Sequence, residues 1–342
     1  MTAQHRQNAL RAWLERRLAP AELLAIPEPV RPDAGGSSDT LFLNPVIRSE
    51  GREREARWVL RIEPTARQIY MLPSLERQFR VMEELGRLGT VPVPGVFWHE
   101  PDPAVLGAPF FVMARVEGQV PSDFVHSQGL LAELPPARRE ALWRDAVRTM
   151  AAIHAVPAER FRFLDRPEYG TGGLDQEIAL WDAYARWSGV PMQPEEERAR
   201  RWLEDHRPAY QADGLAWGDA RIANMMFREE RCVAVLDWET VSLAGAESDL
   251  GWWMFYDWMM AEGWGVPRLE GIGDGPALVA AWEEYAGRRA ENMAWHEVFA
   301  TWRFGLISDR ARFLMRQRGE ADRMPADMPA PHLRRLEMLT GG

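Results

Sequence analysis

The sequence predicts an α+β protein built from two lobes, and three observations lead to this prediction. The chain has 342 residues, more than a single hydrophobic core usually serves. Short stretches of alternating apolar and polar residues, typical of antiparallel strands, are concentrated in the first third of the chain. Beyond residue 134, apolar residues recur mainly at helical spacing. We therefore expect an N-terminal lobe with a small antiparallel sheet at residues 1–117 and a larger, mainly helical C-terminal lobe at residues 118–342.

The N-terminal lobe is expected to begin with an amphipathic helix that packs on the domain. Its apolar side is formed by residues at helical spacing, namely Leu10, Trp13, Leu14 and Leu18. Strands are expected at residues 41–47, 58–63, 96–99 and 109–116. Between the second and third strands, a helix is expected whose apolar face contains Leu75, Phe79, Met82 and Leu85.

The C-terminal lobe is expected to consist of helices around one short strand. A long helix ends before Pro157, and its apolar face contains Trp143, Val147, Met150, Ile153 and His154. We interpret His154 as a core residue and not as a catalyst. Further helices are expected at residues 174–187, 195–210 and 247–260, and the stretch 277–313 is also expected to be largely helical. A buried strand is expected at residues 232–236, because a short apolar run follows the charged turn at 228–231.

The charge composition argues against a nucleic-acid partner. The chain carries 51 acidic and 41 basic residues, a formal net charge of −10. Because the sequence contains no lysine, all 41 basic residues are arginines. Nucleic-acid-binding proteins usually present a basic surface, which this composition does not favour. Any role that a lysine usually has must be taken by an arginine.

Cysteine usage and hydropathy favour a cytoplasmic protein. The single cysteine, Cys232, cannot form a disulfide within the chain, and its apolar surroundings are typical of a buried thiol. There is no run of 18 apolar residues, and the N-terminus lacks the apolar core of a secretory signal. We expect no membrane partner and, since the seven histidines show no paired spacing, no structural zinc. The sequence leaves the oligomeric state open.

The stretch from Leu215 to Glu239 contains the strongest indication of chemistry. Asp219 and Asn224 are five residues apart, the D-x-x-x-x-N spacing of a kinase catalytic loop. Asp237 follows the expected strand at 232–236, so its carboxylate is expected at the end of that strand. Each residue alone is more typical of a turn or a cap, and it is their joint spacing that predicts phosphoryl transfer.

The motif W-G-D-x-x-x-x-N, followed by a strand and D-W-E, resembles the aminoglycoside phosphotransferase and choline kinase-like family. The resemblance is strongest to the branch whose kinase domains are joined to acyl-CoA dehydrogenases, and it extends from the turn at Gly35 to the C-terminal helices. It implies a protein-kinase-like fold and an ATP- and Mg²⁺-dependent transfer of phosphate to a small-molecule hydroxyl group. One departure is Trp217, which stands where the family usually has histidine.

The resemblance also implies roles for individual residues. Asp219 would deprotonate the acceptor hydroxyl, and Asn224 and Asp237 would bind Mg²⁺. Glu239 would accept a hydrogen bond from the substrate or support the metal. Nucleotide phosphates would be bound by a turn and one strand cation, namely Gly35, Gly36, Ser37, Ser38 and Arg61. Arginine is a longer phosphate ligand than the lysine that kinases usually place on this strand.

Two further nucleotide contacts are expected from the family pattern. The helix at residues 73–88 would orient Arg61 through Gln78, although the nearest acid, Glu76, is two residues away and about 200° around the helix. Adenine would contact the chain around Met113 and Arg115, where a strand leads into the lobe connection.

The acceptor is expected to be a hydroxylated small molecule with a substantial apolar or acyl portion. Four tryptophans between residues 252 and 264 favour an apolar site, namely Trp252, Trp253, Trp258 and Trp264. The excess of acids in residues 239–310 instead favours an aminoglycoside-type antibiotic.

Two different classes of protein are also compatible with the sequence. One is a catalytically silent nucleotide-binding module, which the departures at Trp217, Arg61 and Gln78 suggest. The second is a haloacid dehalogenase-type phosphatase, since V-A-V-L-D-W-E-T imitates a D-x-D-x-T motif around Asp237. In such a phosphatase, Asp237 would be a nucleophile instead of a metal ligand.

Overall fold

The chain forms two compact units. The computed structural model describes residues 3–31, 39–64, 68–209, 211–319 and 330–341. The first unit comprises Met1–Gln68, Leu72–Arg87 and Pro94–Glu117. The second unit comprises Ile69–Met71, Leu88–Val93 and Gly118–Gly342.

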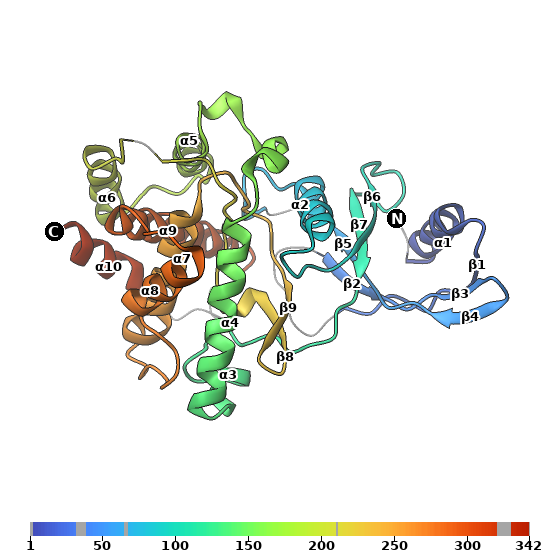
Figure 1. The fold of residues 1–342 in the computed structure, drawn as a ribbon. Coiled ribbons are helices and arrows are strands. Elements are labelled where there is room, and N and C mark those ends of the chain that lie inside the picture. The colour runs from blue at the N-terminus through green and yellow to red at the C-terminus, as the bar shows by residue number, and fades with distance from the viewer. Residues whose placement is uncertain (1–2, 32–38, 65–67, 210, 320–329, 342) are drawn as a thin grey trace. The chain divides into compact units, whose positions relative to one another are not determined.

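The first unit is built on antiparallel strands (Figure 1). A four-stranded sheet has the order β2-β5-β7-β6, and a three-stranded sheet has the order β1-β3-β4. The elements of this unit are α1 (Ala3–Leu18), β1 (Glu22–Ala25), β2 (Asp39–Leu43), β3 (Val46–Ser49), β4 (Arg52–Glu55), β5 (Trp58–Ile62), α2 (Leu75–Leu88), β6 (Val96–Glu100) and β7 (Phe110–Ala114).

Helices α1 and α2 cover opposite faces of the four-stranded sheet. Successive side chains of a strand point to opposite faces, so neighbouring residues of β7 contact different helices. Phe110 of β7 packs against Trp13 of α1, with ring centroids 4.8 Å apart. Its neighbour Phe111 packs against Phe79 of α2, at 6.0 Å. The N-terminal helix therefore packs on the domain, as the spacing of its apolar residues predicts.

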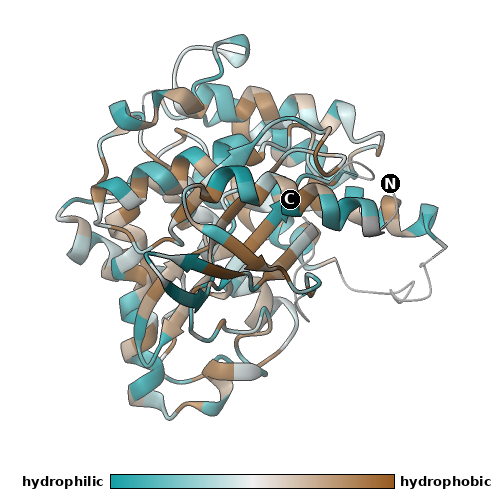
Figure 2. Cartoon of the chain, turned by 90° about the vertical axis from the view of Figure 1, so that its right-hand side faces the viewer, coloured by the Kyte–Doolittle hydropathy of each residue, from teal (hydrophilic) through white to brown (hydrophobic). Residues whose placement is uncertain are grey.

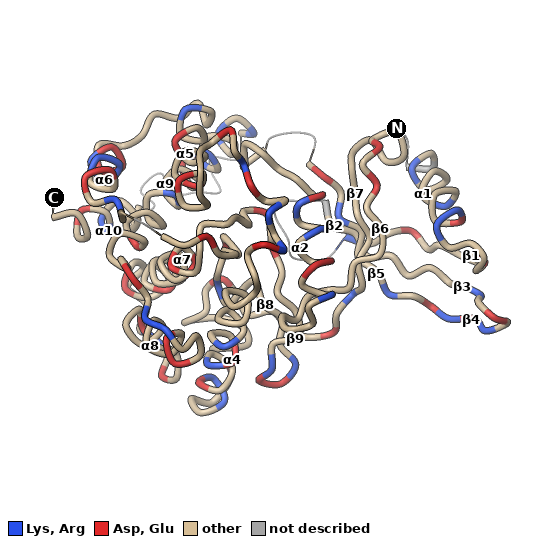
Figure 3. The backbone as a smooth tube through the Cα atoms, turned by 45° about the horizontal axis from the view of Figure 1, so that its top comes forward, with Lys and Arg blue, Asp and Glu red and all other residues tan. Residues whose placement is uncertain are grey.

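The strand predicted at residues 41–47 is two strands. Asn44 and Pro45 separate β2 from β3, and proline cannot donate a ladder hydrogen bond. The charged stretch at residues 50–55 is mostly strand β4, which pairs with β3 through a turn at Glu50 and Gly51, both at positive φ. The side chains of β4 alternate between basic and acidic (Figure 3). Their exposure explains why a polar run forms a strand without an apolar face.

The second unit is mainly helical and contains one two-stranded antiparallel hairpin. Its elements are α3 (Gly129–Glu133), α4 (Pro136–His154), η1 (Ala158–Leu164), η2 (Pro167–Tyr169), α5 (Gly173–Trp187), α6 (Pro194–Asp205), η3 (Ile222–Asn224), β8 (Met225–Arg228), β9 (Arg231–Val235), α7 (Ala246–Trp258), η4 (Met259–Gly263), α8 (Gly275–Ala286), α9 (Met293–Gln317) and α10 (Pro331–Thr340). The predicted stretch 277–313 is thus two helices, and α10 was not predicted.

Helices α7 and α9 pack along each other in the core of this unit. Hydrophobic and hydrophilic residues alternate along the helices of the chain (Figure 2). A large cluster of buried apolar side chains joins α5, α6, α9 and α10. Among the helices of the described ranges, none combines the length and the apolar character that crossing a membrane requires. A sheet-containing first unit and a mainly helical second unit confirm the predicted α+β class.

Candidate functional site

The loop that contains Asp219 is held by a buried carboxylate. The backbone N–H groups of Trp217 and Gly218 donate to the two oxygens of Asp249, at 2.6 and 2.8 Å. Gly218 has a φ of +95°, and a Cβ there would lie 2.2 Å from the carbonyl oxygen of Thr240. Glycine is therefore required before Asp219, and Asp249 fixes the turn that it makes possible.

Asp249 is in turn oriented by a histidine and a tryptophan. The Nε2 of His154 lies 2.9 Å from Asp249, and the indole N–H of Trp282 donates to Nδ1 of the same ring at 2.9 Å. Because Nδ1 accepts a hydrogen bond, the ring proton is on Nε2 and points at the carboxylate. His154 thus supports the Asp219 loop from within the helical core, in keeping with its interpretation as a core residue.

Trp217 connects the loop to the end of strand β9. Its indole N–H donates to the carbonyl oxygen of Leu236 at 2.8 Å, and the carbonyl oxygen of Asp237 lies at 3.1 Å. The side chain is fully buried and packs near Trp238, with ring centroids 6.0 Å apart. The indole therefore braces both segments by hydrogen bonding as well as by packing.

The carboxylate of Asp219 accepts hydrogen bonds from three side chains. Trp252 donates to Oδ1 at 2.8 Å, and Asn224 donates to Oδ2 at 2.7 Å. The Nε of Arg221 lies 3.1 Å from both oxygens. These donors fix the plane of the carboxylate in a half-buried position.

A backbone hydrogen bond brings Asn224 close to the segment that contains Asp237. The Nδ2 of Asn224 donates twice to Asp219, so its amide oxygen points to the other side of the group. Its backbone oxygen accepts from the N–H of Leu236 at 2.8 Å, next to Asp237. Asp237 has a φ of +58°, a conformation that turns the chain sharply after β9.

The carboxylates of the site place Tyr70 in a negative potential. The pKa of Tyr70 is raised well above its ordinary value, first by burial and then by the charges of Asp219, Glu239 and Asp237. The three carboxylates therefore lie close to one side chain and act on the same region. Tyr70 belongs to the second unit, where Tyr184 donates to the carbonyl oxygen of its neighbour Ile69 at 2.7 Å.

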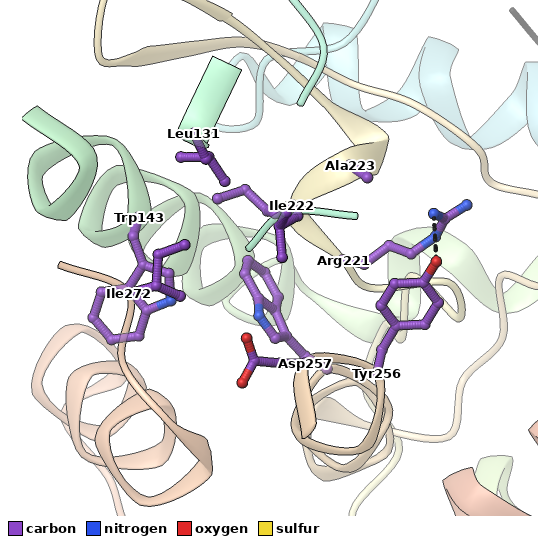
Figure 4. Close-up of a pocket in the computed structure, with 10 residues that line it drawn as sticks. Leu131, Trp143, Arg221, Ile222, Ala223, Tyr256, Asp257 and Ile272 are labelled. Carbon is purple, nitrogen blue, oxygen red and sulfur yellow. Dashed lines mark hydrogen bonds between the residues drawn. The ribbon is translucent and has the colours of Figure 1, made fainter. Parts of the chain in front are cut away.

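Arg221 follows Asp219 by two residues and is one of the residues that line a small cavity (Figure 4). Burial opposes its charge, but the neighbouring carboxylates of Asp219 and Asp123 hold its pKa above the ordinary value. Its guanidinium hydrogen-bonds to Tyr256 at 3.2 Å and also lies over that ring. The cavity has a volume of about 20 Å³, enough for one water molecule.

The predicted nucleotide residues of the first unit have defined places. Arg61 is half-buried in β5, between Thr40 of β2 and Phe111 of β7. Gln78 of α2 is buried, whereas Glu76 is exposed and forms an ion pair with Arg80 at 3.8 Å. The inward residue of this helix is therefore Gln78, the residue that the family pattern indicated.

The remaining predicted nucleotide residues are partly accounted for. Met113 is a buried residue of β7, and the guanidinium of Arg115 lies 4.2 Å from the ring centroid of Phe42. The backbone N–H groups of residues 114 and 115 already donate to Gly95 and Arg57. Adenine would therefore have to use other backbone groups there. Gly35, Gly36, Ser37 and Ser38 lie outside the described residues.

Two residues of the site were not identified from the sequence. In the sequence, Asp249 is one of many acids of the C-terminal lobe, and Trp252 is one of four clustered tryptophans. The sequence pattern that could have indicated them is an acid in the first turn of α7 followed three residues later by a tryptophan. This spacing places both side chains on one side of the helix. That pattern does not indicate which loop the two side chains contact.

Comparisons with known proteins identify the family. Residues 29–297 match the phosphotransferase enzyme family. The curated relatives include mouse acyl-CoA dehydrogenase family member 10, 29% identical over 72% of this chain and 22% of its own length. Human acyl-CoA dehydrogenase family member 11 is 26% identical over 69% of this chain and 30% of its own length. The chain thus spans between a fifth and a third of these relatives.

Solved structures have the same fold. A candidate aminoglycoside phosphotransferase from Ralstonia eutropha is 25% identical, with a TM-score of 0.71 over 98% of this chain and 95% of that one. The macrolide 2'-phosphotransferase MphH from Brachybacterium faecium is 18% identical, with a TM-score of 0.52 over 92% and 95% of the two chains. Aminoglycoside phosphotransferase APH(4)-Ia, in a ternary complex with AMP-PNP and hygromycin B, is 14% identical, with a TM-score of 0.56 over 97% and 98%.

These findings confirm the predicted kinase-like fold. They exclude the interpretation of Asp237 as a dehalogenase-type nucleophile, because β9 pairs in an antiparallel hairpin and the family match includes that hairpin. The chain belongs to the phosphotransferase enzyme family and is a small-molecule kinase.

Proposed function

We propose that this kinase transfers the γ-phosphoryl group of ATP, with Mg²⁺, to a hydroxyl group of a small molecule that has a substantial apolar portion. The observation that carries the proposal is the junction of the Asp219 loop with the end of β9. There the backbone oxygen of Asn224 accepts from Leu236, and Trp217 donates to both Leu236 and Asp237.

Asp219 is the proposed base for the acceptor hydroxyl. An ionised carboxylate offers about four lone-pair sites. Trp252 and Asn224 each donate to one oxygen, and the Nε–H of Arg221 is shared between both, so an acceptor O–H would take the place of one of the two shared Arg221 contacts. The fixed carboxylate can therefore orient an acceptor O–H and take its proton during transfer.

Asn224 at the end of η3 and Asp237 after β9 are of the residue types that Mg²⁺ uses. Asn224 and Asp237 supply an amide oxygen and a carboxylate, which are hard oxygen ligands. Within the described residues, no three side chains of His, Cys, Asp or Glu form a metal site of their own. Mg²⁺ usually binds one or two carboxylates together with water and substrate phosphates. When bound, the ion would neutralise phosphate charge, and Glu239 would add to the negative potential that attracts it.

For the nucleotide we propose the phosphate turn Gly35–Ser38 together with Arg61 and Gln78. Buried Gln78 would orient the Arg61 guanidinium through a neutral hydrogen bond, where an acid would form an ion pair. The adenine contact is proposed for the chain around Met113 and Arg115, through backbone groups that the sheet does not use.

The proposed acceptor class rests on the surroundings of Asp219. Tyr256 of α7 is half-buried and adds aromatic surface beside the loop, whereas the neighbouring Trp252 is buried. The acids whose excess favours a polycationic sugar are largely paired with arginines, namely Glu247 with Arg288, Asp257 with Arg268, Glu283 with Arg289 and Glu284 with Arg144. An apolar alcohol fits better than an aminoglycoside, and a hydroxyacyl compound is one example, since the names of the relatives mention acyl-CoA.

A screen with Mg-ATP tests this proposal. The panel contains linear alcohols, hydroxyacyl thioesters, hygromycin B and kanamycin, and the readouts are ADP release and product mass. We expect phosphorylated hydroxyacyl or aliphatic products and little reaction of the antibiotics. Efficient phosphorylation of the antibiotics alone would show that the acceptor is an aminoglycoside and not an apolar alcohol.

A further inference from the structure

A buried arginine lies beneath the Asp219 loop. Arg303 of α9 is 1% exposed. Its guanidinium carbon lies 4.8 Å from the ring centroid of Trp181, 5.0 Å from that of Trp252 and 5.6 Å from that of Phe299. Three aromatic faces therefore surround this cation.

The polar contacts of Arg303 are sparse for a buried charge. One nitrogen donates to the carbonyl oxygen of Gly218 at a long 3.4 Å, and the carboxylate of Glu177 lies 3.7 Å away. Its Nε has no hydrogen-bond partner among the described residues. Burying a cation in this way costs free energy that the negative faces of the rings offset. A well-packed apolar residue would fill the same space at lower cost, so packing alone does not account for an arginine here.

Trp252 joins this cation to the proposed base. Its face contacts the Arg303 guanidinium, and its indole N–H donates to Oδ1 of Asp219 at 2.8 Å. A cation over an indole draws electron density from the ring and makes the N–H a stronger donor. Arg303 also donates to Gly218, the residue before Asp219. The same arginine therefore acts on both the backbone and the carboxylate of the loop.

We propose that Trp252 and Arg303 are positioning residues that hold the Asp219 carboxylate in the orientation needed to accept the proton of the acceptor. The inference rests on the proposed function, because it assigns a purpose to the orientation of that base. Neither residue touches the reacting atoms. Their effect is on the rate of transfer and not on nucleotide binding.

The first test replaces Trp252 with phenylalanine, which keeps an aromatic face and removes the N–H. The matched control is Trp295→Phe, which removes an equally buried indole N–H that donates to Leu203 at 2.9 Å. Both variants are compared with wild type for kcat with Mg-ATP and the fastest acceptor of the screen, for the Kd of AMP-PNP by calorimetry, and for Tm. We expect Trp252→Phe to lower kcat about tenfold, an effect typical of one lost charged hydrogen bond, with the Kd unchanged within twofold. Trp295→Phe should lower Tm similarly and leave kcat within twofold.

A second pair of variants tests the cation. Glu177→Gln with Arg303→Met removes the charge without leaving a buried carboxylate unpaired, and Glu177→Gln with Arg303→Lys keeps a charge. The kcat should fall in the methionine variant and recover in part in the lysine variant. In ¹⁵N spectra the indole N–H resonance of Trp252 should move in Asp219→Asn, and that of Trp295 should not.

The outcomes separate the two proposals. A wild-type protein without turnover on any alcohol would overturn the proposed function, and the positioning role with it. An active wild type with unchanged kcat in Trp252→Phe would overturn only the positioning role. Equal losses of kcat in Trp252→Phe and Trp295→Phe would also overturn it, since they would indicate a general loss of stability.

Discussion

Trp217 donates its indole N–H to the carbonyl oxygen of Leu236 at 2.8 Å and thereby ties the segment before Asp219 to the segment before Asp237. Histidine is usual at this position in the family that the chain resembles. Here the larger indole reaches the strand end directly. The departure therefore preserves the connection between the proposed base and a proposed metal ligand.

Replacing Trp217 with phenylalanine should weaken that connection. We expect a roughly tenfold lower kcat, as for a hydrogen bond of about 1.4 kcal/mol, and a lower Tm. Initial rates and thermal unfolding measure both effects. The control is Trp13→Phe, which removes an indole N–H bonded to Glu100 at 2.6 Å in the first unit and should leave kcat unchanged. A Trp217→Phe variant as active as wild type would contradict the bracing role.

Asp237→Asn should abolish Mg²⁺-dependent turnover. The amide keeps the shape of the side chain but removes the negative charge, and a neutral oxygen replaces a carboxylate poorly as a Mg²⁺ ligand. Titration of the rate with Mg²⁺ measures the effect, and Asp274→Asn, at an exposed helix N-cap, serves as the control. Turnover within twofold of wild type at all Mg²⁺ concentrations would remove Asp237 from the metal site.

Asp249→Asn should destabilise the protein strongly. Asp249 is fully buried and accepts from Trp217, Gly218 and His154, and an amide has only one oxygen for these donors. We expect a loss of about 2–3 kcal/mol in the free energy of unfolding, measured by denaturant titration. Asp274→Asn should change it little, because asparagine caps a helix as well as aspartate does. Equal stabilities of the two variants would show that the Asp249 network contributes little.

Glu196→Gln should stabilise the protein above neutral pH. Burial raises the pKa of the Glu196 carboxyl to about 7. The folded state therefore binds more protons than the unfolded state between about pH 4.5 and 7, and this group's contribution to stability falls as pH rises through that window. Glutamine cannot ionise, and its oxygen can still accept the N–H of Gln193, as Glu196 does at 2.9 Å.

The lowered pKa values of two buried histidines determine the pH range in which the stability of Glu196→Gln is measured. Burial lowers the pKa of His332 to about 3 and that of His296 to about 4. Their contributions rise with pH up to about 6.5 and oppose the slope from Glu196. Unfolding free energies are therefore compared at pH 6.5 and 8, where the advantage of Glu196→Gln should grow. An advantage that shrinks with pH would reject the assignment.

The features that the sequence predicted are those that depend on residues close together in the chain. The spacing of Asp219 and Asn224 and the apolar strand before Asp237 are local patterns, and the structure places these residues next to one another. Gln78 was selected over Glu76 by the family pattern, and of these two residues it is the buried one. Their chemical roles remain proposals.

Contacts between distant segments could not be predicted in this way. Asp249 holds a loop 31 residues before it in the chain, and Arg303 reaches Gly218 across 85 residues. Which helix face meets which loop depends on the packing of α7 against α9, which no single helical pattern specifies. The exposed strand β4 was missed for another reason, since its charged residues give no apolar alternation.

The proposed role of Asp219 as the base is tested by comparing wild type with Asp219→Ala. Phosphoryl transfer and nucleotide binding are measured on the same samples. Product formation from Mg-ATP is followed with the acceptor found in the screen, and AMP-PNP binding is measured by calorimetry. We predict that kcat falls by about two to four orders of magnitude, as for similarly positioned acid–base groups, while the Kd changes less than threefold. Lost AMP-PNP binding with undiminished residual turnover, or a wild type that binds AMP-PNP without transferring phosphate to any alcohol, would contradict this role.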